Sequence, residues 1–266
     1  MIDIMDIIFF QIKYNFLKKK NLKFFLGIWF ILLIYLVKIK YYFVQYDLNG
    51  NLTDYMIFSI GGWESPILFT SLLDWSFLVF LTLCMSITMS SNFEKINSII
   101  LNRIGSKGKS WMYICVNELF FCFLITFLVF IFSLIIGICF LGYSTNVSEY
   151  TKIFYKDLSN IGFYNLMIYI FIVFFTGIYL LQIMIRAFVC FFYNVNIFYV
   201  IFLIICIFSG FLFVYFKIPK ILSPLFYPSL MLDDSFLIYM NIFRNLIMTI
   251  LFMIIGYFTY LNRDVI

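Results

Sequence analysis

Four ionisable side chains lie inside long apolar runs, where few other residues could do chemistry. They are Asp74, Glu118, Arg186 and Arg244. A charge at the centre of a membrane helix costs about 2.5–3.5 kcal/mol on insertion scales, so each needs a partner or a water-filled path. Glu118 and Arg186 are at matching depths, which predicts an ion pair that ties two helices together or, alternatively, forms a gate or a proton site. Asp74 could pair with Arg244 or face a water-filled path, and the sequence does not choose between these.

The residue types that hydrolases need are scarce. The chain contains no histidine, which excludes Ser-His and Cys-His nucleophile pairs and histidine metal sites. Its six cysteines all lie in apolar runs and form no CxxC pair, so they are predicted to be small buried hydrophobic residues. Asp74 and Glu118 are predicted at opposite depths and therefore form no carboxylate dyad. The sequence predicts no catalytic site, metal or cofactor in this chain.

The composition shows which solvent surrounds these side chains. The chain has 266 residues, of which 65% are hydrophobic and 12% charged, against roughly 45–50% and about 25% in soluble domains. A soluble fold of this size could not bury so much apolar surface, which predicts an all-α membrane protein with one domain over residues 1–266. The net charge of +5 arises from basic residues beside the apolar runs, so it indicates membrane orientation and not nucleic-acid binding.

The apolar runs predict six transmembrane helices, at about 22–44, 66–90, 111–141, 163–193, 197–216 and 237–261. An amphipathic helix in residues 1–20 is expected to lie in the membrane interface before them. Lys38 and Lys40 are expected to reach outward to the headgroups. The Pro-broken stretch 218–234 should dip into the outer leaflet as short helices. The distribution of Lys and Arg places both termini in the cytoplasm.

The longest polar interruption, residues 91–121, joins the second and third predicted spans. Residues 94–101 are predicted to form a short helix across the membrane surface, and a turn at 105–108 then leads into Trp111. Gly108, Lys109 and Ser110 resemble the end of a phosphate-binding loop. That motif needs a glycine where this chain has Arg103, and no strand precedes it, so nucleotide binding by this chain is not expected.

This loop, FEKINSIILNRIGSKGKSW, and the order of the other elements resemble type-2 ABC exporter permeases. That family has an interfacial helix, six spans, a cytoplasmic coupling helix between spans two and three, and a helical outer hairpin before span six. The resemblance covers nearly the whole chain and implies that residues 94–109 dock on a separate ATPase subunit, which binds the ATP. The docking residues would be Glu94, Lys95, Ile99, Arg103, Gly105, Lys107 and Lys109. In the alternative interpretation, the basic residues only bind phospholipid headgroups.

The resemblance also implies a function and partners. The chain would be the permease subunit of an ATP-driven exporter of hydrophobic or amphipathic cargo in a bacterial plasma membrane. It would pair with a second copy or a sister permease, and small permeases of this kind often export antimicrobial peptides or confer immunity to them. Two alternatives stay open. One is a self-contained secondary transporter, although the sequence shows no inverted repeat, and the other is a non-transporting membrane anchor or immunity protein.

Overall fold

The computed structural model describes most of the chain. The described residues are 19–45, 50–62, 69–104, 106–145, 161–189, 195–216, 224–230 and 238–262. Within these ranges the chain is all-helical and contains no strand. Most of the predicted interfacial helix in residues 1–20 lies outside them.

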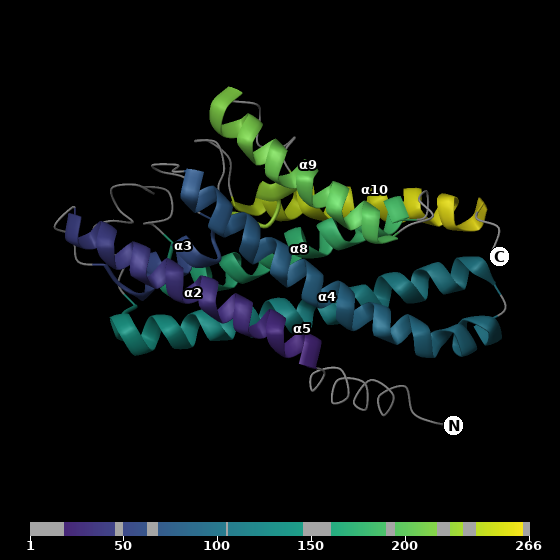
Figure 1. Cartoon of the computed structure of the whole chain (residues 1–266), viewed down its shortest axis with the longest axis horizontal. Coiled ribbons are helices and arrows are strands. Elements are labelled where there is room, and N and C mark those ends of the chain that lie inside the picture. Colours follow the sequence, from purple (N-terminus) through teal and green to yellow (C-terminus); the bar gives the residue numbers. More distant parts are fainter. Residues whose placement is uncertain are drawn as a thin grey trace.

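The long helices lie where the apolar runs are predicted, and they pack side by side as a bundle (Figure 1). Five of them are long and apolar enough to cross a membrane: α2 (Lys19–Gln45), α4 (Phe69–Ile104), α5 (Lys107–Leu141), α8 (Phe163–Val189) and α10 (Ile238–Asn262). A further helix, α9 (Val195–Phe216), stands where the fifth span is predicted and is not among those five. The shorter elements are α3 (Leu52–Ser59) and the 3-10 helix η2 (Pro224–Phe226).

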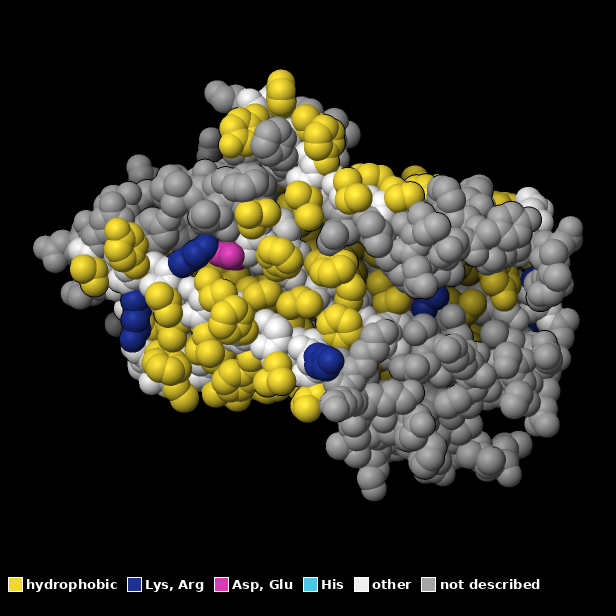
Figure 2. Space-filling model, in the orientation of Figure 1, with side chains coloured by type: hydrophobic (Ala, Val, Ile, Leu, Met, Phe, Trp, Pro, Cys, Tyr) yellow, Lys and Arg dark blue, Asp and Glu magenta, His cyan; other side chains and the backbone are white. Residues whose placement is uncertain are grey.

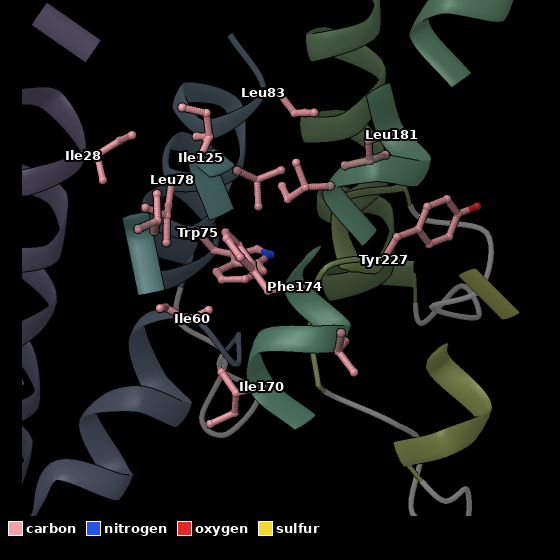
Figure 3. Packing of buried hydrophobic residues seen from close by; sticks show 14 of the residues in the cluster. Ile28, Ile60, Trp75, Leu78, Leu83, Ile125, Ile170, Phe174, Leu181 and Tyr227 are labelled. Atoms are coloured by element: carbon pink, nitrogen blue, oxygen red, sulfur yellow. The ribbon is translucent and has the colours of Figure 1, made fainter. Parts of the chain in front are cut away.

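The centre of the bundle is α8. Its membrane-length window is 72% buried, whereas that of α10, which packs mainly against α8, is 17% buried. Trp75 of α4 and Phe174 of α8 lie against each other in the middle of the core, with ring centroids 6.0 Å apart (Figure 3). The outer face is also rich in hydrophobic side chains (Figure 2). A bundle that is apolar inside and outside is typical of helices that lie in lipid.

The predicted surface helix at residues 94–101 is not a separate element. Instead, α4 continues unbroken for 36 residues, about 54 Å at 1.5 Å per residue. No glycine or proline interrupts the sequence of α4, so nothing in it favours a break before residue 105. Helix α4 ends at Ile104 and α5 begins at Lys107, where the Ser106 hydroxyl accepts a hydrogen bond from the Lys109 amide at 3.4 Å and caps α5.

The predicted outer loop between the first two spans contains the buried helix α3. Asn51 caps it, because the Asn51 side chain accepts from the Thr53 amide at 2.9 Å and Asp54 accepts from the Asn51 amide at 2.9 Å. All eight residues of α3 are buried. The Tyr55 hydroxyl donates to the Leu32 carbonyl of α2 at 3.1 Å. Burial raises the pKa of Tyr55 well above its ordinary value, so this donor stays protonated.

Only residues 224–230 of the Pro-broken stretch 218–234 belong to the described part of the chain, and they are packed inside the bundle. Residues 225–230, which follow the start of η2, are buried among the helices. Irregular backbone at membrane depth is tolerated only where the protein satisfies its hydrogen bonds. Here the Trp75 indole donates to the Leu225 carbonyl at 3.1 Å, and the Leu230 amide donates to the Gly61 carbonyl at 2.6 Å. The segments around 61 and 230 therefore complete each other's backbone hydrogen bonding inside the bundle.

A glycine in α8 makes this burial feasible. A Cβ on Gly177 would lie 2.4 Å from the Pro228 backbone, whereas a Cβ on Gly162 would meet nothing within 4 Å. We expect Gly177→Ala to lower the free energy of unfolding by about 1–3 kcal/mol, the usual cost of overpacking. The matched change Gly162→Ala should have a much smaller effect. Thermal unfolding of the purified protein in detergent measures both, and equal stabilities of the two variants would contradict this packing.

Candidate functional site

The predicted ion pair between Glu118 and Arg186 is present. Arg186 Nε of α8 lies 2.5 Å from Glu118 Oε1 of α5, and the Glu118 side chain is 0% exposed. Ser90 of α4 completes the cluster, because its hydroxyl donates to Glu118 Oε1 at 2.9 Å and accepts from Arg186 Nη2 at 3.1 Å. The pair thus joins three helices, where the sequence predicts two.

A second polar contact lies one turn away. Ser86 Oγ donates to Gln182 Oε1 at 2.8 Å. Ser86 and Ser90 are four residues apart on α4, and Gln182 and Arg186 are four apart on α8, so each pair shares one helix face. Neither serine is among the residues predicted from the sequence to have a role. Their i, i+4 spacing in an apolar run, with matching spacing of Gln182 and Arg186, is the signal that could have identified this interface.

Asp74 pairs with Lys38, and not with Arg244. The ion pair joins α2 to α4, and its side chains are 30% and 20% exposed for Lys38 and Asp74. A carboxylate one helix away therefore satisfies the Lys38 charge, and the sequence did not predict this partner. Lys40 lies over the Phe140 ring of α5, 5.6 Å from its centroid, which is a cation–π geometry.

Arg244 is held by an aromatic ring and an amide. Its guanidinium lies 5.1 Å from the Tyr227 ring centroid, and Nη2 donates to Asn245 Oδ1 at 3.1 Å. Asn245 in turn donates from Nδ2 to the Tyr227 carbonyl at 3.0 Å and to Thr176 Oγ1 at 3.3 Å. Arg244 and Asn245, both on α10, therefore bind the irregular segment 224–230 to α10 and α8. Arg244 is predicted from the sequence as an intramembrane ionisable residue, whereas Asn245 is not predicted to have a role.

These contacts limit the chemistry that the ionisable residues can do. Asp74 and Glu118 each have their own cation on a different helix. In the described ranges, no three His, Cys, Asp or Glu side chains gather in a group that could hold a metal ion. The arrangement fixes helices against one another, which is the usual role of paired charges in a membrane bundle.

The beginning of α5 packs on the C-terminal part of α10. The Trp111 indole donates to the Met253 carbonyl at 3.0 Å. A Cβ on Gly256 would lie 2.1 Å from Trp111 Cζ2, so the indole occupies the space that a larger residue would need. Lys107 Nζ donates to the Leu261 carbonyl at 3.2 Å, as a basic residue can at a helix C-terminus. The beginning of α5 is thereby fixed to α10.

Only part of the predicted docking loop can be placed. The side chains of Lys107 and Lys109 are described, and both are exposed. The backbone of residues 94–103 is helical. The side chains of Glu94, Lys95, Ile99 and Arg103, and the whole of Gly105, lie outside the described part of the chain.

The buried cluster predicts a large stability loss when one charge is removed. Glu118→Gln should lower the free energy of unfolding by about 3–5 kcal/mol, because it leaves the Arg186 charge without its counter-ion. Ser90→Ala removes hydrogen bonds but keeps the ion pair, so it should cost only about 1 kcal/mol. Thermal unfolding in detergent compares them. If the exchange Glu118→Arg/Arg186→Glu recovered none of the loss of the single reversals, the pairing would not stabilise the fold.

The contact between Trp111 and Gly256 predicts non-additive effects. Gly256→Ala should destabilise the wild type by about 1–3 kcal/mol, since the new methyl group would overlap the indole. The same change in a Trp111→Phe background should cost clearly less, because Phe lacks the ring atoms nearest to Gly256. A double-mutant cycle from thermal unfolding gives the interaction energy. Additive effects would show that the contact is loose.

The comparisons with known proteins assign the chain to no family. No protein-family model, curated protein or solved structure matches it. A functional assignment must therefore come from the residues and the geometry of the chain itself.

Proposed function

We propose that the chain is the permease subunit of an ATP-driven exporter in a bacterial plasma membrane. In this proposal α9 is a sixth span, both termini are cytoplasmic, and residues 94–109 dock on a separate ATPase subunit. The permease would act with a second copy of itself or a sister permease. Its cargo would be hydrophobic or amphipathic, such as an antimicrobial peptide, a lipid or a drug-like molecule.

The observation that carries the proposal is the length of the α4–α5 hairpin. The second predicted span ends at about residue 90, where the sequence turns polar and charged, and α4 continues to Ile104, about 21 Å further along the helix axis. This extension carries Glu94, Lys95 and Arg103, and Lys107 and Lys109 follow directly at the beginning of α5. A rigid, charged helical hairpin beyond the membrane is a suitable docking element for a soluble partner. The resemblance predicted the same residues for this role, although as a separate surface helix.

The hairpin is also connected to the spans that it would move. At its turn, Lys107 and Trp111 bind the end of α10. Farther into the bundle, Ser90 and Glu118 bind Arg186 of α8. A displacement of the turn would therefore reach both α8 and α10 through contacts that are already formed. This linkage favours a transmitting role over simple headgroup anchoring by the lysines.

Helix direction supports the proposed topology. The long helices run alternately in opposite directions, and the turn between α4 and α5 lies at the same end of the bundle as the C-terminal end of α10 (Figure 1). Helix α9 has 22 residues, about 33 Å, which is long enough for a hydrocarbon core of about 30 Å. With α9 as a span, the loop and the C-terminus fall on one side, as the distribution of Lys and Arg suggests.

The docking proposal is tested by purification of the tagged chain from native membranes in mild detergent. We expect an ATPase subunit to co-purify with the wild type and to be lost from Glu94→Arg/Arg103→Glu, because the two reversals invert the charge pattern of the hairpin. The control is Lys152→Glu/Lys156→Glu, in the loop between the third and fourth predicted spans, which the proposed topology places on the outer side. This variant should retain the ATPase.

Each outcome separates the alternatives. Loss from the hairpin variant alone supports the permease assignment. Loss from neither variant means that the hairpin charges do not make the contact. If no ATPase accompanies the wild type, the exporter proposal fails, and a secondary transporter or a membrane anchor becomes the better interpretation.

A further inference from the structure

An apolar cavity lies between α4, α8, α9 and η2. Leu83 and Cys84 of α4 form one wall, Phe202 and Cys206 of α9 form the other, and Leu225 lies at the η2 side. Its volume is about 40 Å³, which is room for about three groups the size of a water molecule at about 10–15 Å³ each. Helix α9 leans away from the long axis of the bundle (Figure 1), and the cavity lies beside it.

The lining determines what can occupy the cavity. Among the described residues that line it, no polar atom contributes to the cavity surface. A water molecule needs two to four polar partners to enter, and a purely apolar cavity stays dry. An empty cavity also costs stability, because its lining loses dispersion contacts. The favourable occupant is therefore a hydrocarbon group.

The depth of the cavity identifies the source of that hydrocarbon. The α4 residues that line the cavity run from Ser76 to Ile87, around the middle of the second predicted span, and Cys206 lies near the middle of α9. A helix centre corresponds to the bilayer midplane, because about 20 residues span the hydrocarbon core. The methyl ends of phospholipid acyl chains lie at this depth in both leaflets.

We propose that this cavity binds the methyl end of a phospholipid acyl chain between α4 and α9. The bound chain fills space that no side chain of the described residues fills. The bound acyl chain would allow α9 and α4 to stand apart at this depth without an empty cavity between them. The proposal does not depend on the exporter function, since any membrane protein with this lining at this depth would bind hydrocarbon in the same way.

Photocrosslinking tests the site. The full-length chain is placed in nanodiscs whose phosphatidylglycerol carries a diazirine near the methyl end of one acyl chain, and adducts are located by peptide mass spectrometry. We expect adducts at the hydrocarbon lining residues Leu83 and Phe202 to exceed several-fold those at Ile250, which lies at the middle of α10 and is 58% exposed. Ile250 reports the labelling that lipid contact alone produces at the same depth.

Substitutions in the two walls make the test specific. Cys84→Phe and, from the opposite wall, Cys206→Phe should each fill the cavity and lower labelling of the facing helix several-fold, with Ile250 unchanged. The matched control Cys139→Phe changes an exposed cysteine of α5 outside the cavity, so labelling of the cavity should persist.

Three results would overturn the proposal. The first is labelling of the cavity residues no stronger than at Ile250 in the wild type, a comparison that needs no variant to fold. The second is unchanged labelling in whichever Phe variants fold. The third is labelling only by diazirine-bearing palmitic acid added to unlabelled nanodiscs, which would assign the cavity to a free amphiphile and not to a membrane phospholipid.

Discussion

Within a hydrocarbon solvent, every polar group must find its partner inside the protein, because no water is present to hydrogen-bond it. This constraint explains why the irregular parts of the chain lie where they do. The segment 224–230 can leave helical geometry only because Trp75, Gly61 and Asn245 satisfy its carbonyl and amide groups. Each of these partners comes from a different part of the sequence, so the irregular segment also joins the elements that surround it.

The same constraint governs the charges. Glu118 needs Arg186, and Ser90 supplies further hydrogen bonds to both. Asp74 needs a cation and finds it in Lys38. Arg244 instead has an aromatic ring and a side-chain amide around it. The charges are therefore satisfied in three different ways. The two ion pairs connect different helices, and Arg244 connects α10 to the segment 224–230.

The membrane-length helices could be predicted from sequence because long apolar runs leave no alternative to helices in lipid. The Glu118–Arg186 pair could be predicted because matching depth restricts the choice of partner. Depth alone could not identify the partner of Asp74, since it gives no information about which helices are neighbours. The position of α3 depended on a capping signal made by Asn51 and Asp54, whose form differs from the commoner Ser/Thr with Glu. The unbroken course of α4 reflects the absence of glycine and proline from its sequence, because the polar residues at 91–104 do not by themselves end a helix.

The continuity of α4 has a mechanical consequence. Near its middle, Ser90 is fixed to α5 and α8, while Trp75 near the N-terminal end of α4 is bound to the buried segment 224–230 through Leu225. Measured from Ser90, the arms to Ile104 and to Trp75 are about 21 and 22 Å long. A stiff rod with a fulcrum between arms of nearly equal length behaves as a balanced lever. Tilting the arm that ends at Ile104 would swing the arm that ends at Trp75 by a similar distance in the opposite direction. A displacement of the α4–α5 hairpin would therefore displace the segment 224–230 at the other end of the bundle.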